Sequence, residues 1–150
     1  MEQLARPAIE RLCEQDDLRY PDGPAGLVLV VLYTKAPKAL HFKFGELQRV
    51  GKKHWHKWNA DFDDVAFRKA LVALRTGRPT SEIAGQRSWL LEHGDTVYGG
   101  GVAEDNALAV AASGLKEEAD EAAAWTVYNI IAMLVNLEFK KLKTSGTDNV

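Results

Sequence analysis

The chain is organised around residues 107–121, which read ALAVAASGLKEEADE. Small and apolar residues fill positions 107–112 and predict a strand, Ser113 and Gly114 then turn the backbone, and acidic residues follow. Acidic side chains are favoured at a helix start because the first amide groups of a helix have no partner within it. The segment therefore predicts a strand, a tight turn and a long helix over residues 116–143.

The size and composition of the chain indicate one globular domain over residues 1–150, with 46% hydrophobic and 27% charged residues. A net charge of -2 argues against a nucleic-acid or anionic-lipid partner. The first residues lack an apolar signal core and polar residues interrupt the apolar C-terminal run, so we expect a soluble, cytoplasmic protein without a membrane span. Cys13 is the single cysteine, which excludes an internal disulfide and predicts an inert thiol.

The segments outside the central stretch alternate single helices with pairs of strands. The predicted helices cover residues 7–14, from Asp61 to about Gly77, a short turn at 80–82 and 116–143, and the predicted strands cover 27–33, 40–44, 89–91, 96–102 and 107–112. The turn 34–37 joins the first two strands, and residues 144–150 are expected to fray. This order predicts an α+β domain with a central antiparallel β-sheet flanked by helices, including a long C-terminal helix.

Three segments resemble the haem-degrading-domain family (GlcG/HbpS-like). Residues 112–120 resemble its "V-S-G-L-x-x-E-x-D" segment, and residues 68–77, RKALVALRTG, are similar to its "R-K-x-x-V-x-L-R-x-G" helix. His93 and Gly94 stand where the family has "H-G-G-x-F-P-I", with Asp95 in place of the second glycine. The alternative alignment places the family glycines at residues 99–101.

The resemblance implies a profilin-like fold and a protein that binds haem or another planar anionic ligand. The ligand-binding candidates are His93, Gly94, Gly99, Gly100, Arg68 and Arg75. The sequence leaves the metal ligands unknown, because His41 and His93 are isolated and His54 and His56 share a face only if their segment is a strand.

Two further motifs have two interpretations each. Glycines 99–101 either let a backbone approach a ligand or belong to a closely packed strand. Residues 52–58, KKHWHKW, either hold an anionic group over an aromatic surface or form a solvated loop with its tryptophans packed inward. Ser113 lacks His and acid partners at a recognisable spacing, so we interpret it as a turn residue and not as a catalytic nucleophile.

For function we carry two hypotheses. The first is a small-molecule binding or sensing protein, which the lack of a catalytic triad, metal signature or nucleotide-binding loop in the sequence favours. The alternative is an enzyme acting on a small metabolite in the same inter-element or inter-subunit pocket.

The C-terminal helix predicts self-association. Its apolar residues between 125 and 139 cover more than the roughly 100° of an ordinary surface helix, so a monomer would leave a patch exposed. We therefore expect a homo-oligomer, a dimer or higher. The alternative is that the N-terminal helix covers the second face within the same chain.

Overall fold

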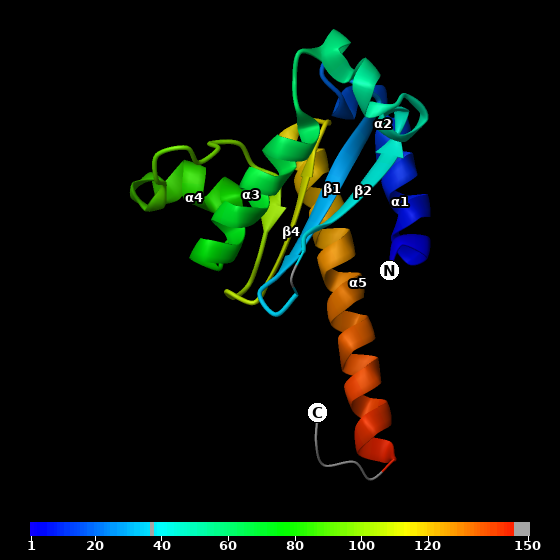
Figure 1. Cartoon of the computed structure of the whole chain (residues 1–150), viewed down its shortest axis with the longest axis vertical. Helices are drawn as coiled ribbons and strands as arrows, with labels where there is room; N and C mark the ends of the chain where they lie inside the picture. Colours follow the sequence, from blue (N-terminus) through cyan, green and yellow to red (C-terminus); the bar gives the residue numbers. More distant parts are fainter. Residues whose placement is uncertain (37, 146–150) are drawn as a thin grey trace.

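The computed structural model describes residues 1–36 and 38–145, and in it a four-stranded antiparallel sheet lies between two layers of helices (Figure 1). The elements are α1 (Glu2–Glu14), η1 (Asp16–Leu18), β1 (Gly26–Tyr33), β2 (Leu40–Gly45), α2 (Glu46–Arg49), η2 (Lys52–Trp58), α3 (Phe62–Thr76), α4 (Thr80–Gln86), η3 (Ser88–Leu90), β3 (Gly101–Val102), β4 (Leu108–Ser113) and α5 (Glu117–Thr144), where η marks a 3₁₀ helix. The predicted α+β class and the long C-terminal helix are confirmed.

Strand β1 is the centre of the sheet, whose strand order is β2-β1-β4-β3. It pairs antiparallel with β2 on one side and β4 on the other, so that Leu29 lies opposite both Phe42 and Ala112. Its continuous apolar sequence fits this position because helices cover both faces of the sheet. The prediction of a strand at residues 27–33 is confirmed.

Alternate residues of β1 pack into two separate hydrophobic cores, one on each face of the sheet. Leu27 and Leu29 face the first core, which contains buried residues of α1 and α5. Val28 and Val30 face the second, which contains buried residues of α3 together with Trp55. The sheet therefore separates α3 from the pair formed by α1 and α5.

Helix α3 begins and ends where its sequence predicts. The Asp61 carboxylate accepts a hydrogen bond from the Asp64 amide at 3.1 Å and so satisfies a free donor of the first turn. At the other end Gly77 adopts a left-handed conformation, with φ of 68°, and its amide donates to the Ala73 carbonyl. These two caps fix where α3 begins and ends.

The structure corrects three predicted segments. Helix α1 begins at Glu2, not at Pro7, and contains Pro7 within it; Arg6 pairs with both Glu2 and Glu10 across this part of the helix. Residues 89–91 were predicted as a strand, which is wrong.

In place of a strand at residues 89–91, the 3₁₀ helix η3 covers Ser88–Leu90. Arg75 of α3 donates to the Leu90 carbonyl and so holds this segment at the end of α3. Of residues 96–102 only Gly101–Val102 form a strand, since Gly100 has φ of 121° and breaks the extended run. Pro37 of the predicted turn and residues 146–150 of the predicted frayed end lie outside the described residues.

Helix α5 has two unlike halves (Figure 1). Its first half packs on the sheet beside α1, where Ala123 and Val127 are buried. Its second half extends beyond the sheet and exposes apolar side chains. Helix α5 is long and apolar enough to cross a membrane, and 22% of the 18-residue apolar stretch within it is buried. This composition alone is weak evidence for a span.

Candidate functional site

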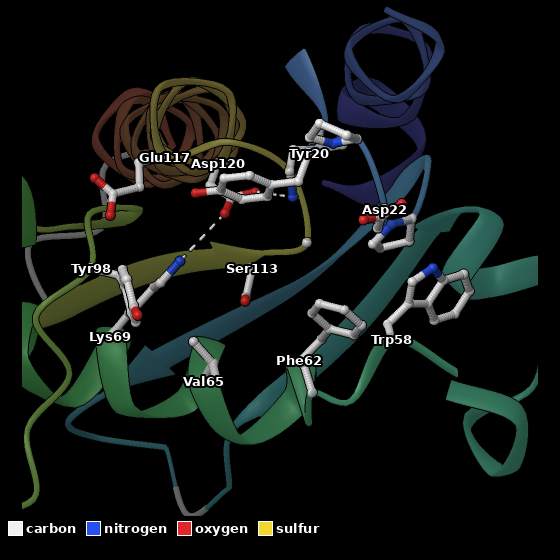
Figure 2. A pocket seen from close by; sticks show the side chains of 16 residues that line it. Tyr20, Asp22, Trp58, Phe62, Val65, Lys69, Tyr98, Ser113, Glu117 and Asp120 are labelled. Atoms are coloured by element: carbon white, nitrogen blue, oxygen red, sulfur yellow. Dashed lines mark hydrogen bonds and ion pairs between the residues drawn. The ribbon is translucent and has the colours of Figure 1, made fainter. Parts of the chain in front are cut away.

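A cavity of about 580 Å³ lies where four segments meet: loop 20–24, the start of α3, the end of β4 and the N-terminal end of α5 (Figure 2). The local sequence explains the opening. Loop 20–24, YPDGP, consists largely of turn-forming residues, so it passes over the sheet without filling the space below. Gly114 then ends β4 with φ of 145°, next to the carbonyl of Gly26.

Aromatic rings form much of the wall of the cavity. Tyr20, Trp58, Phe62 and Tyr98 all line it. Trp58 and Phe62 meet edge to face, with ring centroids 6.2 Å apart, which fixes both rings at the same end of the cavity. Three of these side chains come from loops or the short η2 segment, whereas Phe62 belongs to α3.

A buried ion pair joins α3 to α5 at the cavity. Lys69 Nζ lies 3.4 Å from Asp120 Oδ2 and donates to the Ala112 carbonyl at 2.9 Å. Each side chain is about as buried as the core, with exposures of 3% and 2%. Gly100 closes over the pair, because a Cβ at this position would lie 2.9 Å from Lys69 Nζ. The pair therefore connects three elements of the fold through one buried charge contact.

Asp120, in the first turn of α5, also holds the turn that precedes this helix. Its Oδ1 accepts a hydrogen bond from the Leu115 amide at 3.0 Å. Burial raises the pKa of the Asp120 carboxyl to about 6, and the nearby charge of Lys69 and the amide donors partly offset this rise. The buried carboxylate accepts from a backbone amide of the preceding turn and from a buried ammonium, and these contacts offset the cost of its burial.

Ser113 presents a hydroxyl to the cavity. The residue is 6% exposed and lines the cavity, and Figure 2 shows its side chain pointing from β4 into the space above α3. Among residues 1–36 and 38–145 no hydrogen bond involves its Oγ. A nearly buried hydroxyl normally has a partner, so this atom is a ready hydrogen-bonding group for a molecule in the cavity.

Carboxylates outnumber cations in the lining. Asp22, Glu117 and Asp120 line the cavity, with Lys69 as the only cation among the lining residues of the described chain. Within that same part of the structure, neither Asp22 nor Glu117 forms an ion pair. The pKa of Tyr20, at the same opening, is raised first by burial and then by the charges of Glu117 and Asp120.

The candidates named from the sequence lie in two places. Gly99 and Gly100 lie beside the cavity lining: a Cβ at Gly99 would approach Ser81 and Glu117, and Gly100 covers the buried ion pair. Arg68 lies 3.0 Å from Asp64 on the outer side of α3 and is not part of the lining.

Arg75, His93 and Gly94 form a separate, exposed corner. Arg75 bonds to Asp95 at 2.6 and 3.2 Å, which brings the loop that contains His93 and Gly94 to the C-terminal end of α3. None of these three lines the cavity. The structure thus brings Arg75 close to the loop that contains His93 and Gly94 but places both away from the aromatic walls of the cavity.

The two tryptophans of residues 52–58 have different positions, one in the core and one at the cavity. Trp55 packs inward, buried, and its Nε1 donates to the Val50 carbonyl at 2.9 Å. Trp58 lines the cavity, with Lys57 Nζ 4.4 Å from its ring centroid. His54 and His56 are exposed on η2. In the described residues no group of three or more His, Cys, Asp or Glu side chains could hold a metal ion.

Sequence reasoning missed Lys69 and Asp120 as members of the site. A signal for both exists: Lys69 shares the apolar stripe of α3 with Ala66, Ala70 and Ala73, and Asp120 shares that of α5 with Ala123, Ala124 and Val127. A charged residue on an apolar stripe predicts a buried, paired charge. The acidic run after Gly114 predicts only a helix-start role for Asp120.

The fold and the site define a small α+β domain with an aromatic-walled cavity at the start of its last helix. Comparisons with protein-family models, with curated proteins and with solved structures found no match to this chain.

Proposed function

We propose that the protein binds a small, planar molecule in this cavity, as a binding or sensing protein. The observation that carries the proposal is a cavity with aromatic walls and an unpartnered, nearly buried hydroxyl, Ser113. Ligand pockets typically measure about 300–1,000 Å³ and combine apolar walls with a few polar groups, and this cavity has both properties. Flat aromatic walls favour a flat ligand, because stacked or edge contacts then bury the most surface.

A neutral indole, tryptophol, is a suitable first probe, with its binding measured by calorimetry. We expect saturable binding to the whole chain and a weakening of roughly fivefold or more in Trp58→Ala, which removes part of the wall. Trp89→Ala is the matched control, because Trp89 is 73% exposed and does not line the cavity. Tyr20→Ala repeats the test at an exposed wall residue if Trp58→Ala does not fold. Lack of saturable tryptophol binding at millimolar concentration contradicts the proposal.

Haem, the ligand that the resemblance implies, fits this cavity poorly. Haem iron takes axial ligands such as His, Cys, Met or Tyr, and of these only the two tyrosines occur in the lining. Its propionates would meet Asp22 and Glu117 where paired cations are needed. We expect no saturable Soret shift with micromolar haemin; a shift that His93→Ala abolishes would place haem at the exposed corner of Arg75 instead.

The alternative of an enzyme uses the same cavity, where Lys69, Ser113 and Asp120 are the only groups of catalytic type with buried side chains among the described lining residues. Lys69 and Asp120 are engaged with each other, and no hydrogen bond links Ser113 to a base within the described chain. Nucleophilic catalysis requires such an activated pair. Binding is therefore the better-supported function.

We also propose that the second half of α5 mediates self-association. Its exposed apolar residues are Met133, Leu134, Val135, Leu137 and Phe139. Helix α1 covers only the first half of α5, so it leaves this patch open. The twelve residues after Ala132 measure about 18 Å, which is short of the roughly 30 Å of a bilayer core.

A second copy of the chain is therefore the occupant that we propose for this patch. Light scattering tests it: we expect a mass of at least twice 16.6 kDa, lowered by Val135→Asp. A mass of one chain across a wide dilution range contradicts the proposal.

A further inference from the structure

We infer that the ligand of the cavity is a cation: a planar or compact apolar body with a positively charged nitrogen. The inference rests on the proposed function and adds the charge of the ligand to it. It also departs from the anionic ligand that the resemblance implies.

The first support is the charge of the lining. Asp120 and Lys69 neutralise each other at 3.4 Å, so the pair contributes little net charge to the space beside it. Asp22 and Glu117 remain, and no cation within the described chain pairs with either. Two carboxylates without a counter-ion at one opening attract a positive charge and repel a negative one.

The second support is the type of side chain around these acids. Tyr20, Trp58 and Tyr98 present aromatic rings to the same cavity, and aromatic faces attract cations through their quadrupole. Glu117 acts on the same space as Tyr20, since its charge contributes to the raised pKa of the Tyr20 phenol. Aromatic rings beside carboxylates are the usual means by which proteins bind ammonium groups.

Lys57 lies against one ring of the aromatic wall, and it does not reverse this charge. Its ammonium lies over the Trp58 ring and 3.8 Å from Glu46, which offsets it. Lys57 is also not part of the cavity lining. The N-terminal end of α5 is a second source of positive potential, and the acidic residues of its first turn, Glu117, Glu118 and Asp120, offset it. Among the described lining residues, the charges without an ion-pair partner are therefore those of Asp22 and Glu117.

Ser113 points to a ligand independently of the charges. Its hydroxyl is nearly buried, lacks a partner in the described chain and faces the cavity between the aromatic end and Lys69 (Figure 2). A hydrogen-bonding group on the apolar body of the ligand would satisfy it. The cavity thus offers three complementary contacts: rings for the body, a hydroxyl for a polar atom and carboxylates for the charge.

Three indoles with the same ring and similar short side chains test the inference: tryptamine, a cation; tryptophol, which is neutral; and indole-3-acetate, an anion. Calorimetry on the whole chain at neutral pH and low salt measures each dissociation constant. We expect tryptamine to bind roughly tenfold more tightly than tryptophol, since one ion contact and one cation–π contact each contribute a few-fold, and indole-3-acetate to bind most weakly. Added salt should reduce the advantage of tryptamine.

The double variant Asp22→Asn/Glu117→Gln should bring tryptamine to the affinity of tryptophol and leave tryptophol unchanged. Glu138→Gln is the matched control, because Glu138 is an exposed carboxylate near the far end of α5 and does not line the cavity. Equal binding of the three probes, or tightest binding of indole-3-acetate, overturns the inference and leaves the proposed function standing. Failure of all three probes to bind overturns both.

Discussion

Helix α3 carries two cations that pair with acids from later in the chain, and the two pairs behave in opposite ways. Lys69 meets Asp120 in the interior, whereas Arg75 meets Asp95 at an exposed corner, where the Arg75 side chain is 35% exposed. Burial raises the pKa of the Asp120 carboxyl, but the Arg75 hydrogen bond lowers the pKa of the Asp95 carboxyl. Pairing with a cation therefore accompanies a raised carboxyl pKa in the interior and a lowered one at the surface. Desolvation is the dominant effect only at the buried pair.

The largest difference between the pairs should appear when each cation is removed. Lys69→Met leaves the Asp120 carboxylate buried without its counter-ion, and we expect the free energy of unfolding to fall by about 3–5 kcal/mol in urea denaturation. The double variant Lys69→Met/Asp120→Asn should recover part of the loss, because it removes the orphaned charge. A loss below about 1 kcal/mol in Lys69→Met would show that the pair is not buried as described.

The pH dependence of stability should reveal the raised pKa of Asp120. A carboxyl whose pKa rises from 3.8 to about 6 on folding holds its proton more tightly in the folded state, so its contribution is greatest at low pH and decreases as the pH rises through 6. Relative to Asp120→Asn, the wild-type chain should lose up to about 3 kcal/mol between pH 4 and pH 7. Parallel curves for the two proteins, measured by urea denaturation, would contradict this prediction.

The exposed pair of Arg75 and Asp95 should contribute less to the free energy of unfolding than the buried pair. Arg75→Gln removes two hydrogen bonds to Asp95 and one to the Leu90 carbonyl, all at the surface. We expect a loss of about 1 kcal/mol in the free energy of unfolding, because water replaces the lost contacts and screens the charges. Thermal unfolding beside Lys69→Met gives the matched comparison. An equal loss in the two variants would mean that burial does not separate the pairs.

The smallest effect is the pH response of the exposed pair, and its sign is opposite. The pKa of Asp95 is lowered first by the Arg75 hydrogen bond, so its contribution is present above its unfolded pKa and disappears as the pH falls through the folded pKa. Compared with Asp95→Asn, the wild-type chain should therefore become relatively less stable on acidification below about pH 4. A relative gain on acidification, as expected at Asp120, would contradict the assignment.

Much of the fold could be predicted because its signals are local. The apolar run at residues 27–33 predicts a strand buried on both faces, and β1 is the central strand. Asp61 and Gly77 mark the ends of α3 through hydrogen bonds within one turn of each residue. The strand at 89–91 was wrong because apolar residues of β-forming type need a partner strand, and the Arg75 contact holds this segment elsewhere.

The candidate site was less predictable, because its parts come together only in space. Asp22, Trp58, Lys69, Ser113 and Asp120 come from five segments, and no spacing in the sequence relates them. The sequence contains a signal for buried charges that its predictions did not use, since Lys69 and Asp120 interrupt apolar stripes. Sequence patterns could not indicate that these two residues pair with each other, which depends on how α3 and α5 pack on the sheet.

By itself the sequence determined the order of helices and strands, the α+β class and the wide apolar surface of the last helix, because periodicity and capping act over a few neighbouring residues. The tertiary structure alone decided which carboxylates are paired and which face the cavity. It also decided that Trp55 belongs to the core while Trp58, three residues later, lines the cavity. The physical reason is that burial and charge pairing depend on neighbours distant in the chain, and these neighbours raise the pKa of Asp120 and place Asp22 and Glu117 at the cavity.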